Sequence, residues 1–282
     1  MSIHPLAIVD PKASIGPGVE IGPFCVVERD VTIGEGCRLE SHVVIKNGTS
    51  IGSGTLIMEG AVLGGFPQHI NMPENPGRLV VGSGNTVREN ATIHRAMEPE
   101  NTTRIGDNNL VMGNVHIAHD CQIGNRTILT NNVMLAGHVI VEDRAFLSGA
   151  VGVHQFCRIG TLTMVGGQAH INKDILPYVT LHGLSSLVVG LNTVGLRRAG
   201  YDSGAIRQLK AAYRVIYRSG LSWNGILERL RTEFSEGPAA AFHRFCSTTK
   251  RGIVQERRLP PGATIKLPEK SEAEPAAQRK VG

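Results

Sequence analysis

Histidine is concentrated in one part of this chain, where six residues could take part in proton transfer: His94, His116, His119, His138, His154 and His170. A neutral imidazole accepts a proton near neutral pH, so this stretch predicts a general base. His119 is the best candidate, because an acid, Asp120, directly follows it. Neighbours in sequence need not touch, so the group that orients the His119 ring stays open.

Motifs that the sequence lacks narrow the chemistry that such a base could serve. There is no serine nucleophile elbow, and no glycine-rich phosphate loop lies between a strand and a helix. An acyl-enzyme intermediate is therefore not expected. Direct attack by a substrate hydroxyl, deprotonated by His119, is the simpler hypothesis.

A repeat of six residues must position these side chains. In steps of six from Ile3 to Ile171, 26 of 29 positions are Ile, Val or Leu. The exceptions fall near 64–80 and 96–104, which we expect to be loops. Each hexad would form one flat face and one corner, and three faces would complete a coil. The repeat therefore predicts a parallel β-helix over residues 1–177, with one aliphatic residue of each hexad pointing inward.

Residues 18 apart should therefore stack in columns, and one column contains His119, Gly137 and Gln155. Polar side chains that alternate with the inward positions must point outward, to solvent or to a neighbouring subunit. A backbone N–H at Gly137, one coil away from His119, could donate a hydrogen bond to an oxyanion. A base, a nearby N–H and space for a substrate between them predict an acyl-transfer site.

Cysteines occupy the second inward position of the hexad, where the other residues are small: Cys25, Cys37, Cys121 and Cys157. We expect buried thiols there rather than ligands, nucleophiles or disulfides. Reduced cysteines and the lack of a secretory signal predict a cytoplasmic protein. No apolar run is long enough to predict a membrane span.

The hexad stops after Pro177, and helical spacing predicts a C-terminal α-helical domain over 178–256. We expect helices near 184–199, 203–219, 222–235 and 237–256, with Ser203 and Ser222 as N-caps. Residues 257–282 are rich in Pro, Glu and Lys and are expected to be a disordered tail. The fold class is thus mainly β, followed by helices.

Charge divides the chain unevenly. Residues 1–177 hold 12 Lys and Arg against 16 Asp and Glu, a net charge of −4, whereas residues 178–282 hold 17 against 8, a net charge of +9. A basic end predicts an anionic partner. Nucleic acid is not expected, because no aromatic residues interleave with the basic ones. An acidic protein or a phosphorylated ligand fits this charge.

The hexads resemble those of the hexapeptide acyltransferases, whose β-helices are left-handed and whose subunits form trimers. Over residues 3–252 the chain further resembles the cytosolic UDP-N-acetylglucosamine O-acyltransferases of lipid A synthesis. The motifs that carry this likeness include HIAHDC, VHQFC, LAGHV, TIHR and MVGG. The resemblance implies a homotrimer that moves a 3-hydroxyacyl chain from acyl carrier protein to the 3-hydroxyl of a UDP-sugar, with no cofactor.

The resemblance also implies roles for individual residues. His119 would be the general base, and the Gly137 amide would stabilise the oxyanion; Asp120 is a further catalytic candidate because it adjoins His119. The cleft between subunits would be lined by His94, His116, His138 and His154, with Gln155 near the sugar. Further along the chain, Asn192 and Arg198 would contact the nucleotide, and Gly167 would sit where the acyl chain ends. The basic end would receive the acidic acyl carrier protein.

Three positions depart from the family pattern. The loop after Leu63 has His69 and Asn71 where the family has an acid and a lysine that bind the sugar, and Val194 replaces a glutamate near the nucleotide. We therefore expect His69 and Asn71 to contact the sugar, with intact transfer chemistry and altered recognition of the acceptor. A UDP-diamino sugar, which would give an N-acyl product, is an open alternative.

Two other classes of function also stay open. One is a zinc hydratase similar to the gamma-class carbonic anhydrases, which hold zinc with three histidines between subunits. His116 and His119 are closer in sequence than the paired histidines of that family, which argues against zinc, so no metal ligand is assigned. The other is a scaffold that keeps the β-helix but has no turnover, and the presence of His119 and Gly137 argues against it.

Overall fold

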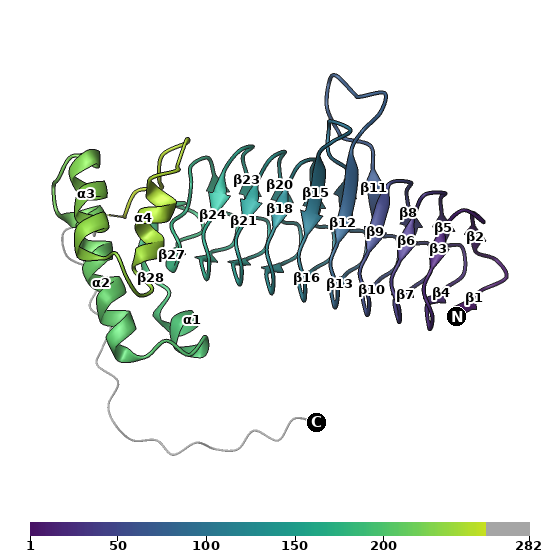
Figure 1. The fold of residues 1–282 in the computed structure, drawn as a ribbon, viewed down its shortest axis with the longest axis horizontal. Helices are drawn as coiled ribbons and strands as arrows, with labels where there is room; N and C mark the ends of the chain where they lie inside the picture. The colour runs from purple at the N-terminus through teal and green to yellow at the C-terminus, as the bar shows by residue number, and fades with distance from the viewer. Residues whose placement is uncertain (258–282) are drawn as a thin grey trace, which may run out of the picture.

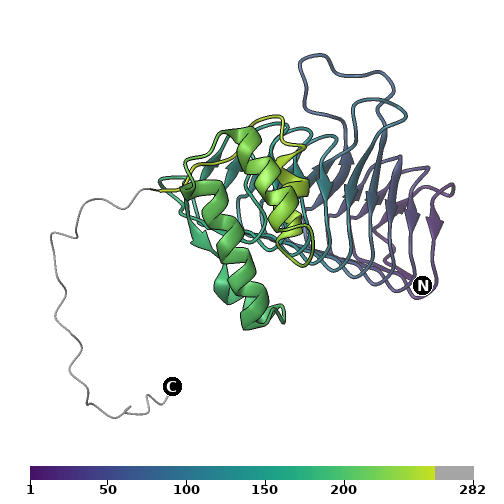
Figure 2. The same cartoon turned by 60° about the vertical axis from the view of Figure 1, so that its left-hand side comes forward.

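The computed structural model describes residues 1–257 as a long three-sided prism with a helical cap at one end (Figures 1 and 2). All but the first residue of the expected tail at 257–282 lies outside the described residues. The prism is a parallel β-helix, as the hexads predict, and every strand pairing along it is parallel except the last.

Three parallel sheets form the faces of the prism. The first contains β1 (Ser2–Ile3), β4 (Glu20–Ile21), β7 (Arg38–Leu39), β10 (Leu56–Ile57), β13 (Thr86–Val87), β16 (Leu110–Val111), β19 (Ile128–Leu129), β22 (Phe146–Leu147), β25 (Met164–Val165), β27 (Val179–Leu181) and β28 (Val188–Leu191). The second contains β2 (Ile8–Val9), β5 (Val26–Val27), β8 (Val44–Ile45), β11 (Val62–Gly65), β14 (Thr92–His94), β17 (His116–Ile117), β20 (Met134–Leu135), β23 (Gly152–Val153) and β26 (His170–Ile171). The third contains β3 (Ser14–Ile15), β6 (Thr32–Ile33), β9 (Thr49–Ile51), β12 (Arg78–Val81), β15 (Thr102–Ile105), β18 (Gln122–Ile123), β21 (Ile140–Val141) and β24 (Arg158–Ile159).

The strand register confirms the predicted columns. His116 pairs with Met134, Met134 with Gly152, and Gly152 with His170, so each of these three steps along the second sheet is 18 residues. The neighbouring aliphatic position of each strand points inward, and Ile117 and Leu135 are fully buried there. The interior is therefore a stack of aliphatic layers along the prism axis.

The corners of the prism force a left-handed backbone conformation on residues other than glycine. Asn114, Asp120, Arg126, Asn132 and His138 all have φ between 55° and 61°, and they are spaced six residues apart. Such a conformation is unfavourable for most side chains, so the surrounding coil must stabilise it. Two candidate site residues, Asp120 and His138, therefore occupy corners whose direction the coil fixes.

Loops interrupt the coil at the two predicted places. Residues 66–77 connect β11 to β12 and project from the prism, and residues 95–101 connect β14 to β15 (Figure 1). The cysteines are also as predicted: the four in the hexads and Cys246 are buried and free.

The C-terminal part differs from the sequence prediction in several places. The helix expected at 184–199 is wrong, because Val188–Leu191 form β28, which pairs antiparallel with β27 and extends the first sheet. Only α1 (Thr193–Arg198) is helical there. β-branched residues and Gly190, with φ of 149°, suit this edge strand better than a helix.

Three further helices cover the end of the prism: α2 (Ser203–Arg218), α3 (Trp223–Glu233) and α4 (Ala240–Cys246). Ser222 caps α3 as predicted, but the N-cap of α2 is Asp202 rather than Ser203, because the Asp202 carboxylate accepts a hydrogen bond from the Ala205 N–H. The helix expected at 237–256 is restricted to α4. The chain after it is extended, and Ile253 and Glu256 form isolated bridges with the prism. No helix of residues 1–257 has the length and apolar character needed to cross a membrane.

Candidate active site

A cavity of about 520 Å³ lies against β17, β20, β23 and β26, on the second sheet. Its polar lining consists of Gln68, His69, His116, His119, His154, Gln155 and His170, and its apolar lining includes Ala118, Met134, Leu135, Ala136 and Val153. Gly137 and Gly152 complete the wall. The stacking of residues 18 apart thus brings histidines from separate coils into one cavity.

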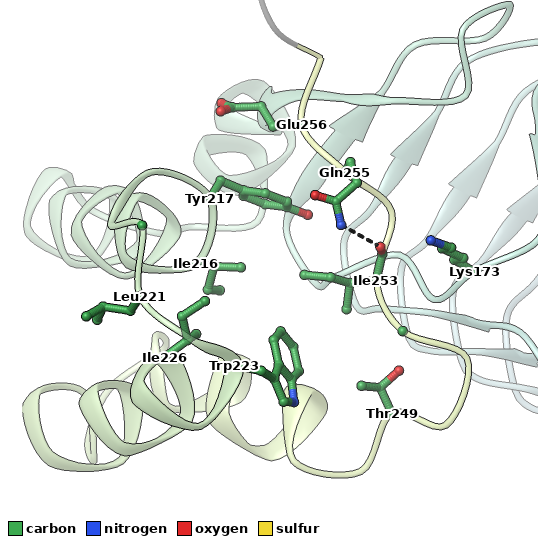
Figure 3. Close-up of a pocket in the computed structure, with 12 residues that line it drawn as sticks. Lys173, Ile216, Tyr217, Leu221, Trp223, Ile226, Thr249, Ile253, Gln255 and Glu256 are labelled. Carbon is green, nitrogen blue, oxygen red and sulfur yellow. Dashed lines mark hydrogen bonds between the residues drawn. The ribbon is translucent and has the colours of Figure 1, made fainter.

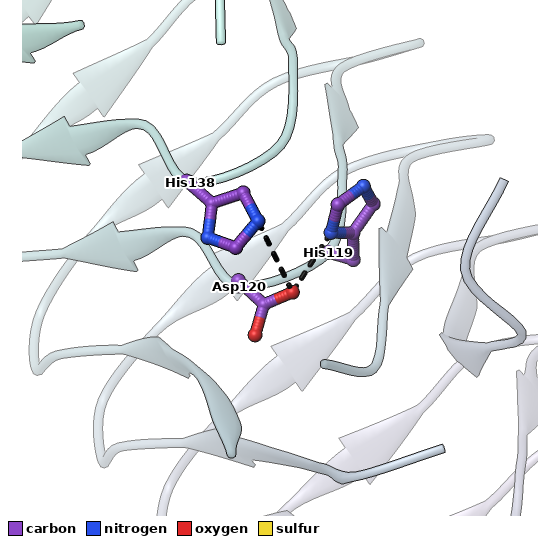
Figure 4. Close-up of side chains that lie close together, drawn as sticks. All are labelled: His119, Asp120 and His138. Carbon is purple, nitrogen blue, oxygen red and sulfur yellow. Dashed lines mark hydrogen bonds and ion pairs between the residues drawn. The ribbon is translucent and has the colours of Figure 1, made fainter. Parts of the chain in front are cut away.

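His119 and Asp120 form a buried hydrogen-bonded pair at the edge of this cavity. Nδ1 of His119 lies 2.8 Å from Oδ2 of Asp120, and each residue is only 8% exposed (Figure 4). The same carboxylate oxygen accepts a hydrogen bond from the Met97 N–H, and the Asp120 N–H donates to Thr103 Oγ1. Asp120 is therefore the group that orients the His119 ring. With Nδ1–H donating to Asp120, Nε2 has a free lone pair and can act as a base.

Gly137 approaches the His119 ring so closely that no side chain fits. A Cβ at position 137 would lie 2.5 Å from Cε1 and 2.7 Å from Nε2 of His119. The Gly137 N–H makes no backbone hydrogen bond to residues of the described part of the chain. The Gly137 backbone thus lies against the His119 ring, and its N–H could donate to a substrate oxygen there.

His94 and His116 lie next to each other on the second sheet, with ring centroids 5.1 Å apart. The Nδ1 atom of His116 bonds to Thr92 Oγ1, and Nδ1 of His94 bonds to the carbonyl oxygen of Phe66. Burial lowers the pKa of both imidazoles below the usual value. Both rings are therefore neutral near pH 7. Of the two, His116 lines the cavity, whereas His94 does not.

His138 lies next to the His119–Asp120 pair. Its ring packs edge-on against His119, at 5.2 Å between centroids, and stacks on Phe156 at 4.6 Å. Its Nε2 atom is 3.8 Å from Oδ2 of Asp120. Burial lowers the pKa of His138 more than the Asp120 carboxylate raises it. His138 thus packs against the His119–Asp120 pair without lining the cavity.

The loop at 66–77 brings His69 to the site. The His69 ring lies edge-on to the His119 ring, with centroids 5.9 Å apart, and it lines the cavity. Asn71 does not line the cavity, and its backbone N–H donates to Nδ1 of His69 at 3.1 Å. His154 and Gln155 are exposed and also line the cavity.

A second cavity of about 650 Å³ lies on the first sheet, and it is lined by Asn192 and Arg198. Arg126 and Arg144 also line it, and the sequence reasoning missed them. They are 18 residues apart, so the same column arithmetic could have found them. Within one chain, the structure therefore separates the predicted nucleotide residues from His119, because the two cavities lie on different faces of the prism.

Three other predicted positions have clear surroundings. Asn192 caps α1: its Oδ1 accepts from the Gly195 N–H, and its Nδ2 donates to the Leu162 carbonyl. Val194, which is 55% exposed, lines the second cavity. Gly167 lies over Gly149 at a corner and lines neither cavity.

A third cavity, of about 660 Å³, lies between α2, α3 and the extended chain near Ile253 (Figure 3). Tyr217, Trp223 and Ile226 form one side and Lys173 the other. No histidine lines it, and it lacks a base–acid pair like that of His119. It separates the helices from the last extended segment and has no part in the chemistry considered for His119.

The zinc alternative predicted three histidine ligands. Within residues 1–257, the group close enough to share an ion is His119, Asp120 and His138 (Figure 4). Two of these atoms are the hydrogen-bonded nitrogen and oxygen of the base–acid pair. His116 is outside the group, so His116 and His119 do not share a site of this kind.

Comparison with known proteins identifies the family. Residues 174–254 match the second domain of UDP-N-acetylglucosamine O-acyltransferase, and residues 12–47, 30–65 and 102–137 match the bacterial transferase hexapeptide. The chain is 44% identical to the acyl-(acyl-carrier-protein)–UDP-N-acetylglucosamine O-acyltransferase of Janthinobacterium sp. (strain Marseille), over 90% of this chain and 99% of the relative. The corresponding protein of Alkalilimnicola ehrlichii is 47% identical with the same coverage.

Solved structures agree with this assignment. The UDP-N-acetylglucosamine acyltransferase of Francisella novicida is 38% identical, with a TM-score of 0.87, over 90% of this chain and 94% of that chain. The enzyme of Moraxella catarrhalis RH4 is 40% identical, also with a TM-score of 0.87, over 90% of this chain and 100% of that chain. The predicted left-handed β-helix with C-terminal helices is confirmed. The chain belongs to the UDP-N-acetylglucosamine O-acyltransferase family.

Proposed function

We propose that this protein transfers a 3-hydroxyacyl chain from acyl carrier protein to the 3-hydroxyl of UDP-N-acetylglucosamine, the first step of lipid A synthesis. The observation that carries the proposal is the close approach of three groups. These are the buried Asp120 carboxylate, the His119 ring that it orients, and the Gly137 N–H beside that ring. Family membership favours this reaction over a zinc hydratase or a scaffold.

The reaction needs no covalent enzyme intermediate. Nε2 of His119 takes the proton of the sugar hydroxyl, while the hydroxyl oxygen attacks the thioester carbonyl carbon. The carbonyl oxygen becomes an oxyanion and accepts a hydrogen bond from the Gly137 N–H. The carbon–sulfur bond then breaks, and the leaving thiolate takes the proton back from His119. Asp120 stabilises the imidazolium between these two steps.

The remaining site residues bind the substrates. The wall around the sugar is formed or supported by His69, Asn71, His94, His116, His138, His154 and Gln155. The nucleotide is bound by Asn192 and Arg198. Gly167 limits the acyl chain. Arg126 and Arg144 lie beside Arg198 and supply further positive charge for a phosphate.

A homotrimer would complete the site. The cavity containing His119 and the cavity containing Arg198 lie on different faces of one prism. Threefold packing of a three-sided prism can place the first face of one subunit against the second face of the next. This arrangement would bring the nucleotide residues of one chain to the base of another, in agreement with the expected cleft between subunits.

The donor would dock on α2. Arg207, Lys210, Arg214 and Arg218 are exposed, and their spacing of three or four residues places them along one side of this helix. The net charge of +9 over residues 178–282 supports an acidic partner at this end. The buried free cysteines support a cytoplasmic location, where such a partner would be found.

A UDP-diamino sugar is the second candidate acceptor. The observation that favours it is His69, whose ring lies edge-on to the His119 ring at a position where the family resemblance implies an acid. An amine in place of the sugar hydroxyl would attack the same thioester, and the product would be an amide.

The test compares both acceptors side by side, with 3-hydroxyacyl carrier protein as donor and with wild type and His119→Ala. We expect wild type to form an ester with UDP-N-acetylglucosamine, and we expect His119→Ala to lose at least about 100-fold in kcat, because a general base typically contributes 10²- to 10⁴-fold. Amide formation from the diamino sugar at a higher kcat/KM would establish the second candidate. No transfer to either acceptor would overturn the proposal.

A further inference from the structure

Phe66 begins the loop that carries His69, and two consecutive residues of another coil hold it. The Phe66 carbonyl oxygen bonds to Nδ1 of His94, and the Phe66 ring lies under the guanidinium group of Arg95. We call the set of His94, Arg95 and Phe66 the Phe66 clasp. Phe66 itself is 45% exposed, so burial in an apolar core does not fix its position.

Arg95 is the unusual member of the clasp, because it is only 4% exposed. Its guanidinium carbon lies 4.8 Å from the centroid of the Phe66 ring. Among residues 1–257, Nε and Nη2 of Arg95 have no hydrogen-bond partner. Burial lowers the pKa of Arg95, and the Glu28 carboxylate partly opposes this. A desolvated guanidinium interacts more strongly with an aromatic face than an exposed one does, so the ring is a main partner of this cation.

His94 holds the backbone of the same residue. It is 8% exposed, and its lowered pKa keeps the ring neutral near pH 7, so that Nδ1–H can donate to the Phe66 carbonyl. The backbone also adapts here. The register between β11 and β14 shifts between Leu63 and Gly65, and a Cβ at Gly65 would lie 3.2 Å from the His94 ring. The start of the loop is therefore held both by the hydrogen bond of the Phe66 carbonyl and by the contact between the Phe66 ring and the Arg95 guanidinium.

The loop residue that matters lies three positions beyond Phe66. His69 leaves the coil with this loop, yet its ring returns to the edge of the His119 ring. We infer that Arg95 and Phe66 are positioning residues that hold His69 against the catalytic histidine and thereby set the recognition of the acceptor sugar. The inference rests on the proposed function, since it assigns His69 to the sugar subsite.

Kinetics with Phe66→Ala and Phe66→Tyr provide the first test. For Phe66→Ala we expect the KM for the sugar nucleotide to rise about 3- to 30-fold, the range that the loss of a partly desolvated cation–π contact gives. The KM for the acyl donor should stay within about twofold, because the proposed function assigns the docking of the donor to α2 and not to this loop. Phe66→Tyr keeps the ring and should restore the wild-type KM. Arg95→Lys, which loses the planar guanidinium, should behave like Phe66→Ala.

Phe24→Ala is the matched control. Phe24 is 52% exposed and stacks on His42 at 4.9 Å, but it lies in an early coil far from the loop. This variant should leave both KM values unchanged. If Phe66→Ala also leaves the KM for the sugar nucleotide unchanged, or if both substrates are affected equally, the clasp is not a positioning device.

Hydrogen exchange of residues 66–77 separates this inference from the proposed function, because it needs no turnover. Faster amide exchange in Phe66→Ala and Arg95→Lys, with unchanged exchange in the coil at 105–171, supports the clasp even if neither acceptor is acylated. Unchanged exchange in the loop would overturn it. Wild type that is inactive with both acceptors would overturn the proposed function alone. Equal melting temperatures of the variants and of Phe24→Ala exclude a general loss of folding.

Discussion

Nδ1 of His119 lies 2.8 Å from Oδ2 of Asp120, the residue that directly follows it in the chain. Two adjacent residues can face each other in this way because Asp120 occupies a corner of the coil with φ of 60°. In an extended strand, neighbouring side chains point to opposite sides. The corner turns the carboxylate back toward the preceding ring, and the Met97 N–H holds it there.

Replacing Asp120 by Asn tests this arrangement. The amide has nearly the same shape, but it carries no charge to stabilise the imidazolium, and it can donate to Nδ1 and so select the wrong tautomer. We expect kcat to fall by about 10²- to 10⁴-fold with little change in KM, as for the loss of charge next to a catalytic histidine. Steady-state kinetics with both substrates measure this. A kcat within threefold of wild type would show that Asp120 has only a structural role.

Gly137→Ala tests the close approach to the base. The new Cβ would have to displace the His119 ring, and a displacement of about 1 Å costs on the order of 100-fold in rate. Gly113→Ala serves as the control, since the nearest atom to its Cβ is the flexible amide of Asn131 at 3.3 Å. We expect kcat to collapse in Gly137→Ala while the melting temperatures of the two variants remain similar. Full activity of Gly137→Ala would contradict the geometry of the site.

The buried histidines should make stability depend on pH. Burial lowers the pKa of His94 and His116 below the usual value of 6.5, so the unfolded chain takes up protons first as the pH falls. Their contribution to stability is complete above pH 6.5 and is lost as the pH drops through the folded pKa values. Urea unfolding between pH 8 and pH 5 should show this decline.

A substitution identifies the residue responsible for the decline. His116→Gln should flatten the dependence on pH, whereas the same change at the exposed His4 should leave it as it is. Equal slopes for wild type and His116→Gln would mean that other groups cause the decline in stability.

Charge reversal on α2 tests the docking of the donor. Lys210→Glu combined with Arg214→Glu should raise the KM for acyl carrier protein by about tenfold at low salt, and the effect should shrink as ionic strength rises. The KM for the sugar nucleotide should not change. Lys12→Glu combined with Arg29→Glu reverses two exposed charges at the other end of the prism and should have no effect. A similar loss in both double variants would contradict a specific surface on α2.

The cysteines should resist alkylation in the folded protein. Burial raises the pKa of Cys121 and Cys246 to about 12 and that of Cys157 to about 11, so few thiolates exist at pH 8. Mass spectrometry after iodoacetamide treatment should find almost no label on native protein and five labels after denaturation. Rapid labelling of Cys121 under native conditions would contradict the inward position of this side chain.

The sequence predicts most of the prism because a single rule governs it. The hexad fixes which side chains point inward, and the 18-residue coil placed Gly137 next to His119 without coordinates. The same rule could have identified Arg126 and Arg144, since they too are one coil apart. Where the period is intact, local sequence and overall fold give the same answer.

The hexad repeat predicts nothing about the residues outside it. The orientation of His69 could not be predicted, because the clasp of Arg95 and Phe66 that holds its loop joins residues with no repeat relation. β28 was missed for a similar reason: it pairs antiparallel across the end of the first sheet, so tertiary pairing overrides the local pattern. The contact between His119 and Asp120 depends on a corner conformation that adjacency in sequence does not reveal.

The corners spaced six residues apart also restrict how this protein can change through insertion or deletion. One residue added between His119 and Gly137 would turn every later side chain out of its column and separate the base from its oxyanion donor. A loop that leaves the coil and returns at the same point, as residues 66–77 do, has no such effect. Length variation is therefore tolerated in the loop at 66–77 and excluded from the coil between His119 and Gly137. If this loop binds the acceptor as we propose, such enzymes can exchange sugars while their transfer chemistry stays constant.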